Sequence, residues 1–357
     1  MKDTNLIIGK KNTGKTTYIL FNELKNAIKN SDNLCIYNTR DEYFKTFSSV
    51  LKENGYNVLT LNIDEASKSN GFNLLQVPYE LYKEGKKDKS IELVDILAKE
   101  IFKEDNPYSD PFWQNMASSY FTGLVLILFN EGKTEEINLG SIQVMMSQGE
   151  EKYNDTTYLK EYLNNIDVTN TIYSMLSPIV FAPADTKGSI ISVCKQKLNS
   201  YMYREELLNM LNTNDIDIRN LQQKTAIIII ASKQNDLANI LINQLVEVSN
   251  MSFTYILDNF DSLRKLLCFN NLLDNASYNK NKVYIAIHNE NEFKDLYGKY
   301  IIDRFDNVIN LNEDKEIISN IEKIELGNDS DYPVLNIKTS NYINFKKLIE
   351  KNKMVML

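Results

Sequence analysis

Short apolar runs alternate with amphipathic segments near both ends of this chain. Six runs have the length and the Ile, Val and Tyr content of strands buried on both faces; they span residues 5–9, 34–37, 58–61, 225–231, 253–257 and 283–287. Helical patterns separate most of them, and this alternation is typical of βαβ units. The pattern predicts an α/β fold with a mainly parallel central sheet wrapped by helices.

The middle of the chain has a different pattern. Between residues 85 and 211 almost every segment shows helical periodicity, in the stretches 91–102, 111–130, 139–147, 157–164, 171–181 and 186–211. We interpret residues 85–211 as an all-helical subdomain inserted into an α/β domain formed by residues 1–84 and 212–357. Near the C-terminus, one more strand is expected at 334–337 and a closing helix at 345–351.

A glycine-containing loop joins the first apolar run to the first helical pattern, and it comprises Gly9, Lys10, Lys11, Asn12, Thr13, Gly14, Lys15, Thr16 and Thr17. It is a complete G-x-x-x-x-G-K-[ST] phosphate-binding loop in its strand–loop–helix context. Gly9 and Gly14 let backbone N–H groups point at an anion, which the helix dipole also favours. Lys15 is expected to reach the β- and γ-phosphates, and the Thr16 hydroxyl to bind Mg²⁺. The loop predicts a bound nucleoside triphosphate, assumed to be ATP; the alternative is a surface turn before a helix.

An acid is needed on a neighbouring strand to hold the magnesium ion. Asp258 directly follows the run 253–257, at the strand end where α/β sheets place their ligands. Its alternative role is that of a helix-capping residue. Asn259 occupies the place where a water-activating Glu usually stands, and an amide can orient a water but cannot take its proton. Hydrolysis is therefore expected to be slow, or to depend on another carboxylate such as Glu42 or Asp261.

His288 is the only histidine of the chain, and it follows the run 283–287. Its position suits a sensor that detects the γ-phosphate and responds to its loss. A histidine at the end of a strand can equally be a structural residue held by hydrogen bonds. The sequence leaves both roles open.

Composition narrows the class of protein. With 43% hydrophobic and 25% charged residues among 357, the chain is an ordinary globular protein. Its three cysteines, Cys35, Cys194 and Cys268, are too far apart for a zinc motif or a disulfide framework, which favours a reducing, cytoplasmic environment. The formal charge of −8 argues against a basic DNA-coating protein, although a local basic patch remains compatible with it. No apolar run approaches the ~20 residues of a membrane-spanning helix, and no signal peptide is evident.

Six motifs follow the phosphate-binding loop in the order found in one known family. They are Asn38-Thr39-Arg40-Asp41-Glu42 after the second strand, Ser69 to Asn73, Asp110-Pro111-Phe112-Trp113, Thr186 to Ser192, Leu257-Asp258-Asn259-Phe260, and His288 to Tyr297-Gly298. In this arrangement the chain resembles the TraG-type coupling ATPases of conjugation and type IV secretion, a branch of the FtsK/HerA motor proteins.

The resemblance implies a RecA-like P-loop NTPase that binds ATP and Mg²⁺. It also implies a DNA or nucleoprotein substrate, a homo-oligomer such as a hexameric ring, and a membrane-bound secretion partner. Three departures stand out. The transmembrane helices usual at the N-terminus of members are not seen, Asn259 replaces a Glu, and His288 replaces a sensor Gln. The stretch expected to carry an arginine finger, 275–282, contains lysines instead, and Arg304 lies beyond the sensor strand.

Two functional hypotheses follow from these residues. The first is a coupling or translocase ATPase in which Lys15, Asp258, Asn259 and His288 form the reaction site. The second is a nucleotide-binding scaffold or regulator of a mobile-element system, with weak or no ATPase activity, which Asn259 and the missing finger favour. A small-molecule kinase is disfavoured because the insert is too large for a simple lid.

Overall fold

The structure is a computed structural model that describes residues 3–104, 108, 110–232, 235–312, 321–335 and 341–355. These residues form two compact units. One combines the described parts of Met1–Asn70 and Asp215–Leu335, and the other combines Gly71–Asn214 with the C-terminal segment 341–355.

The bounds of the second unit differ from the predicted insert, 85–211. It begins earlier because helix α3 (Gln76–Lys83) packs against helix α4 (Lys87–Phe102). It also includes helix α14 (Phe345–Val355), which packs against helix α6 (Leu139–Gly149).

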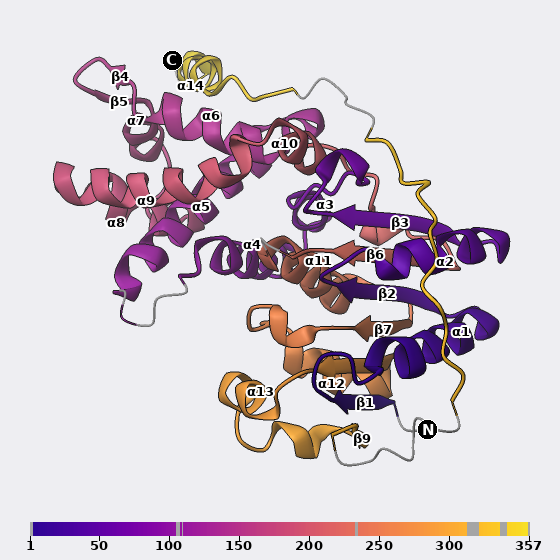
Figure 1. Cartoon of the computed structure of the whole chain (residues 1–357). Coiled ribbons are helices and arrows are strands. Elements are labelled where there is room, and N and C mark those ends of the chain that lie inside the picture. Colours follow the sequence, from indigo (N-terminus) through magenta and orange to yellow (C-terminus); the bar gives the residue numbers. More distant parts are fainter. Residues whose placement is uncertain are drawn as a thin grey trace. The chain divides into compact units, whose positions relative to one another are not determined.

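A seven-stranded sheet forms the centre of the first unit, in the order β3-β6-β2-β7-β8-β1-β9 (Figure 1). All of its strand pairs are parallel. The strands are β1 (Thr4–Ile8), β2 (Asn33–Asn38), β3 (Asn57–Asn62), β6 (Thr225–Ile230), β7 (Phe253–Leu257), β8 (Lys282–Ile287) and β9 (Asn307–Asn310). The first six are the predicted runs, and β9 is an edge strand that the apolar pattern did not reveal.

The direction of the crossovers assigns the helices to the two faces of this sheet. The connections β1–β2 and β2–β3 run toward one edge, and those from β6 to β9 run toward the other. Because parallel crossovers are right-handed, helices α1 (Phe21–Asn30) and α2 (Glu42–Glu53) cover one face, and α11 (Asn235–Val248) and α12 (Phe269–Tyr278) cover the opposite face. The buried cluster on the first face joins helix and strand residues, among them Phe21, Phe44, Phe47, Ile36, Ile228 and Ile256.

An extended segment, residues 321–335, crosses the outer side of α1 and α2 (Figure 1). Tyr332 stacks on Phe44 with ring centroids 4.0 Å apart, and its hydroxyl donates to Asp41 at 2.7 Å. The backbone N–H of Ile324 donates to the carbonyl of Thr17 at 3.1 Å. We call residues 321–335 the strap. The predicted strand 334–337 is not seen at Val334 and Leu335, and its remaining residues lie outside the described part.

The second unit is mainly helical. Its long helix α5 (Pro111–Glu131) begins after Asp110, whose carboxylate accepts from the backbone N–H of Phe112. The predicted helix 186–211 is instead two helices, α9 (Ala184–Met202) and α10 (Glu205–Leu211), and a two-stranded hairpin, β4 (Lys152–Tyr153) with β5 (Thr156–Thr157), interrupts the helical pattern. The remaining helices are α7 (Tyr158–Asn164) and α8 (Thr171–Val180). Among the described residues, no helix combines the length and apolar character that a membrane crossing requires.

Candidate functional site

The predicted phosphate-binding loop lies between β1 and a π-helical turn, Lys15–Leu20, that leads into α1. Gly14 has φ +90°, a conformation that side chains rarely adopt, and a Cβ there would lie 2.5 Å from the Tyr18 ring. A Cβ on Gly9 would lie 2.5 Å from Thr13 Oγ1. Both glycines are therefore required by the loop conformation itself, whereas Lys10, Lys11 and Asn12 are exposed at its tip.

Lys15 is buried and turned back onto the loop. Its ammonium group donates to the carbonyl oxygens of Gly9 and, at 3.0 Å, of Lys10. Burial lowers the pKa of Lys15, and the negative charges of Asp258 and Asp261 oppose that shift. The ammonium group is thus placed at the loop with two carboxylates nearby, where it can also contact phosphate oxygens.

Asp258 meets the loop across the strand ends. Its carboxylate is fully buried and accepts from the Thr16 hydroxyl at 2.6 Å, from the Tyr43 hydroxyl at 3.2 Å and from the backbone N–H of Asn259 at 2.8 Å. Burial raises the pKa of Asp258, against the effects of these hydrogen bonds and of Lys15. The two predicted magnesium-associated residues, Thr16 and Asp258, are therefore in direct contact.

The oxygen donors at this contact suit a magnesium ion. Mg²⁺ prefers oxygen ligands and usually takes only one or two from the protein, the rest coming from phosphates and water. A hydroxyl beside a buried carboxylate matches that donor set. In the part of the chain that the structure describes, no group of three or more His, Cys, Asp and Glu side chains is arranged to hold a metal, so a site here requires ligands from the nucleotide.

Asn259 is turned away from the phosphate loop. It has φ 51°, and its side-chain amide donates to Asn38 Oδ1 at 2.5 Å at the end of the adjacent strand β2. Glu42, considered as an alternative base, lies on the same side, where it accepts from the Asn38 amide at 3.2 Å. Asn259 and Glu42 are thus both hydrogen-bonded to Asn38, the last residue of β2.

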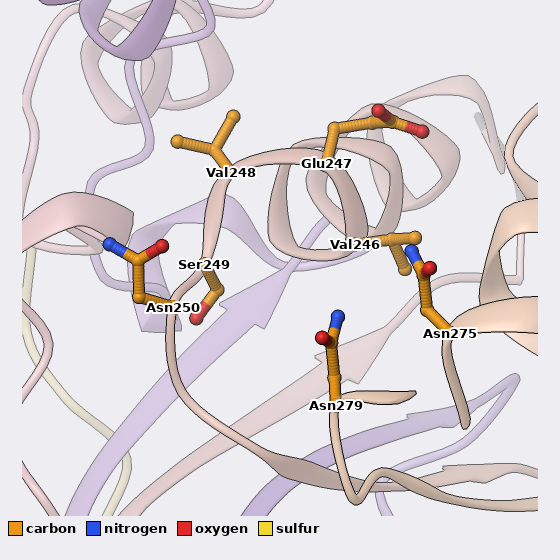
Figure 2. A pocket seen from close by; sticks show the side chains of 7 residues that line it. All are labelled: Val246, Glu247, Val248, Ser249, Asn250, Asn275 and Asn279. Carbon is orange, nitrogen blue, oxygen red and sulfur yellow. The ribbon is translucent and has the colours of Figure 1, made fainter. Parts of the chain in front are cut away.

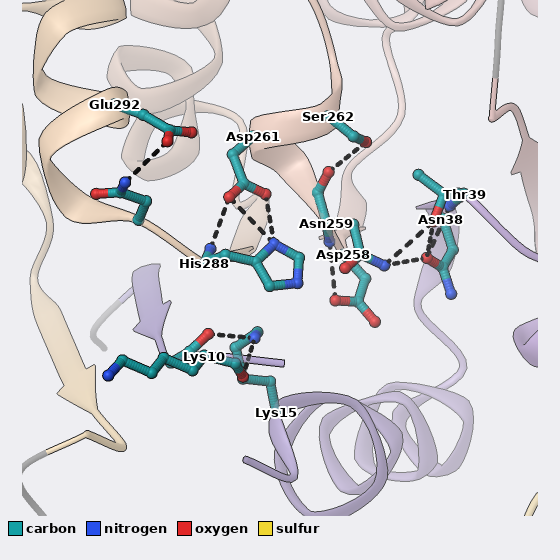
Figure 3. Close-up of polar contacts among 12 residues, drawn as sticks. Lys10, Lys15, Asn38, Thr39, Asp258, Asn259, Asp261, Ser262, His288 and Glu292 are labelled. Atoms are coloured by element: carbon teal, nitrogen blue, oxygen red, sulfur yellow. Dashed lines mark hydrogen bonds and ion pairs between the residues drawn. The ribbon is translucent and has the colours of Figure 1, made fainter. Parts of the chain in front are cut away.

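Asp261 and His288 form a pair that the sequence did not single out. The Asp261 carboxylate accepts from the backbone N–H of His288 at 2.8 Å and lies 2.9 Å from its Nδ1 (Figure 3). Asp261 belongs to the turn Phe260–Ser262 after β7, and His288 follows β8, the neighbouring strand. The pair arises from the adjacency of β7 and β8, and the only signal in the sequence was a polar residue after each strand.

An aromatic cluster fixes the turn that carries Asp261. Phe260 stacks on Tyr297 with centroids 5.8 Å apart, and Phe269 lies 4.2 Å from the same ring. The Tyr297 hydroxyl accepts from the backbone N–H of Leu266 at 2.9 Å. Tyr297 lies on helix α13 (Glu290–Tyr297), which follows His288. The cluster therefore ties the Asp261 turn to the helix that begins beside His288.

Two other features lie away from this site. Arg304 pairs with Asp274 and Asn270 on α12 of its own chain. A polar pocket of 360 Å³ opens near the start of β7, at the opposite ends of the strands from the phosphate loop (Figure 2). It is lined by Val246, Glu247, Val248, Ser249, Asn250, Asn275 and Asn279. Because Asp258 follows the other end of β7, this pocket is not part of the phosphate-loop site.

Several solved structures share the fold. The bacterial conjugative coupling protein TrwBdeltaN70, in its trigonal form with sulphate, is 12% identical with a TM-score of 0.57, over 86% of this chain and 70% of that one. The plasmid coupling protein TrwB in complex with ADP and Mg²⁺ is 12% identical with a TM-score of 0.57, over 95% of this chain and 86% of that one. The complex of TrwB with the ATP analogue ADPNP is 12% identical with a TM-score of 0.54, over 85% of this chain and 69% of that one. No curated protein matches the chain in sequence.

These likenesses establish the RecA-like P-loop α/β fold. The sequence itself matches a family model described as type IV secretory system conjugative DNA transfer, over residues 6–303. That match spans both the strands that carry the phosphate loop and the helical insert. The chain belongs to the type IV secretory system conjugative DNA-transfer family.

Proposed function

We propose that this chain is an ATP-dependent coupling protein that acts on DNA or a nucleoprotein substrate. The observation that carries the proposal is the 2.6 Å contact between Thr16 Oγ1 and Asp258 Oδ2. It brings the phosphate loop and the acid of a separate strand to one point, as binding of Mg²⁺ and a triphosphate requires. Membership of a conjugative DNA-transfer family supports the DNA substrate.

In this proposal the loop residues Gly9–Thr17 surround the phosphates with backbone N–H groups. Lys15 leaves the carbonyls of Gly9 and Lys10 to contact the β- and γ-phosphates, and Thr16 and Asp258 hold the magnesium ion directly or through water. The ion, when bound, neutralises charge on the β- and γ-phosphates. Nucleotide complexes of TrwB, one of them with Mg²⁺, support this assignment. A homo-oligomer, hexameric by resemblance, would couple the reaction to movement of the substrate.

A second candidate is a nucleotide-binding scaffold of the same transfer system, with ATP as a structural ligand. Asn259 favours it, because its amide is engaged by Asn38 at 2.5 Å and offers no base. Incubation with MgATP, removal of free nucleotide and identification of what stays bound distinguish the two. Retained ADP supports the enzyme, and retained ATP supports the scaffold.

The test of the proposed function is steady-state ATP hydrolysis with and without single- and double-stranded DNA. We expect turnover that depends on Mg²⁺ and rises with DNA, and its loss in Lys15→Ala. A native chain that binds MgATP but shows no turnover with either kind of DNA would contradict the proposal of a coupling ATPase and would favour the nucleotide-binding scaffold. A native chain that binds no nucleotide would contradict both.

A further inference from the structure

Asp261 fixes the tautomer of His288. Nδ1 lies 2.9 Å from Asp261 Oδ1 and 3.1 Å from Oδ2, and the backbone N–H of His288 donates to the same carboxylate. A carboxylate accepts hydrogen bonds and cannot donate them, so Nδ1 carries a proton, and in the neutral imidazole Nε2 presents a lone pair. The His288 side chain is partly exposed, at 26%. Nε2 is therefore a nitrogen that can accept a proton.

The sheet places His288 beside the phosphate loop. Strand β8 lies between β7, which ends before Asp258, and β1, which leads into the loop. The backbone N–H of Gly9 donates to the carbonyl of Ile287 at 3.1 Å, so His288 follows at the level of the first loop residue. In Figure 3 the imidazole extends from Asp261 toward the part of the site that holds Lys15 and Asp258.

The place next to Asp258 supplies no base of its own. Asn259 carries an amide, which cannot take a proton from water, and that amide is directed at Asn38. A reaction that removes a proton from the attacking water therefore needs an acceptor from another strand. Within the described part of the site, the Asp261–His288 pair is such an acceptor with a fixed orientation.

We propose that His288 Nε2 is the general base of ATP hydrolysis in this chain and that Asp261 is its positioning residue; this rests on the proposed function. The water oxygen forms a bond to the γ-phosphorus while Nε2 takes one of the water protons. The bond between the γ-phosphorus and the β–γ bridging oxygen breaks, and its electron pair stays on ADP. The imidazolium, stabilised by the Asp261 charge as in other carboxylate–histidine pairs, then releases its proton to solvent. Water and ATP give ADP, phosphate and one proton.

The pH dependence of turnover reports this step together with the charges around the imidazole. Among the charged groups labelled in Figure 3, Asp261 on the turn after β7 contacts the imidazole. Asp258 after β7 and Lys15 on the loop lie on the side toward which the ring extends, and Lys10 on the loop and Glu292 on α13 point away from it. A base must be unprotonated to act, so turnover that depends on a general base falls as the pH is lowered.

The experiment measures kcat from pH 5 to pH 9 for the native chain, Asp261→Asn, His288→Gln, and His288→Gln with Asn259→Glu. MgATP binding by each variant serves as the control for folding. We expect His288→Gln to lower kcat by about 10²–10⁴-fold, to leave ATP affinity within about threefold, and to abolish the acid limb. Adding Asn259→Glu should restore turnover with its acid limb moved toward the range of a carboxyl group.

The single histidine allows a second readout without ATP. Its imidazole ¹⁵N signals need no assignment, because the chain has one histidine. In the neutral form of the ring they should show a protonated Nδ1 and an unprotonated Nε2, and Asp261→Asn should lower the share of this tautomer. The opposite tautomer in the native chain overturns the proposal.

The kinetic outcomes separate this proposal from the proposed function. If the native chain hydrolyses ATP and His288→Gln keeps the native pH profile, whether slower or at full rate, His288 is not the base although the ATPase stands. If the native chain binds MgATP without turnover, both the assignment of His288 as the base and the proposed ATPase function are contradicted. If it binds no nucleotide, the proposed function fails outright.

Discussion

The two sides of the candidate site are built in different ways. On the loop side, neighbouring residues hold one another, as when Lys15 donates to Gly9 and Lys10. On the strand-end side, partners lie far apart in sequence, and Asp261 meets His288 only because β7 and β8 are adjacent. In the proposed function, binding of phosphate is thus determined by a contiguous motif, whereas the groups available for the reaction are determined by strand order.

Within the candidate site, the departures from the family pattern fall on one side only. The loop motif is complete, but the strand ends carry Asn259 and His288 in place of the Glu and Gln that the resemblance predicts. Substitutions of the loop residues and of Asp258 should therefore change nucleotide affinity, and substitutions of Asn259 and His288 should change turnover or stability more than affinity.

The largest effect is expected from Lys15→Ala. Loss of an ammonium group that makes charge-assisted hydrogen bonds to phosphates should raise the Kd for MgATP by about 100-fold or more. Titration with a fluorescent ATP analogue measures it. The matched control is Lys11→Ala, an exposed lysine in the same loop, which should change Kd by less than about threefold. Equal effects of the two substitutions would show that Lys15 contributes to ATP affinity only through the overall positive charge of the loop.

The next effect concerns the strap that borders the loop side. Tyr332→Ala removes the stack on Phe44 and the hydrogen bond to Asp41, and it should lower the free energy of unfolding of the first unit by about 2 kcal/mol. Tyr332→Phe keeps the stack and should cost about 1 kcal/mol. Chemical denaturation measures both. Identical losses for Ala and Phe would show that stacking contributes nothing.

A smaller effect is expected from Asp258→Asn, and it depends on pH. Burial raises the pKa of Asp258, so the ionised group destabilises the nucleotide-free fold. For a carboxyl with a raised pKa, the favourable contribution is present at low pH and is lost as pH rises through the folded-state value. Asp258→Asn should therefore have a Tm a few degrees above that of the native chain at pH 7, with the difference shrinking on acidification.

Two comparisons control that measurement. Asp331→Asn, which changes an exposed acid paired with Lys52, should alter Tm little at any pH. With saturating MgATP at pH 7, the native chain should have the higher Tm of the two, because only the Asp258 carboxylate helps to hold the magnesium ion. A native Tm above that of Asp258→Asn at pH 7 without nucleotide would contradict the prediction.

The smallest effect is expected from Asn259→Gly. Asn259 has φ 51°, which glycine adopts without steric cost, so relief of backbone strain should partly offset the lost bond to Asn38. Stability should change by less than about 1 kcal/mol, and ATP affinity should be unchanged. A tenfold loss of affinity would show that Asn259 contributes to nucleotide binding and would contradict the division of the site into a binding side and a reaction side.

The sequence predicted the parts of the fold that depend on local pattern. Continuous apolar runs located six strands, but β9 escaped because Asn307–Asn310 has an asparagine at each end and forms an edge. The helix expected at 186–211 ends at Met202, and a second begins at Glu205, a break that the apolar periodicity did not mark.

The parts of the site that local sequence signals mark could be predicted. The loop follows from its motif, and Asp258 from its place after a strand. The contacts Tyr43–Asp258, Asn259–Asn38 and Asp261–His288 were not predictable, because each requires knowing which strands are neighbours. A list of polar residues after strands does not give the strand order.

The most direct test of the account is a double-mutant cycle between Thr16 and Asp258, read out as the Mg²⁺-dependent part of ATP affinity. Thr16→Val and Asp258→Asn are combined, and Thr16→Ser, which keeps the hydroxyl, is the control. If both residues hold one ion, the two losses should be non-additive, with a coupling of about 1 kcal/mol or more, and Thr16→Ser should behave like the native chain. Losses that add to within about 0.5 kcal/mol would contradict a shared magnesium ion.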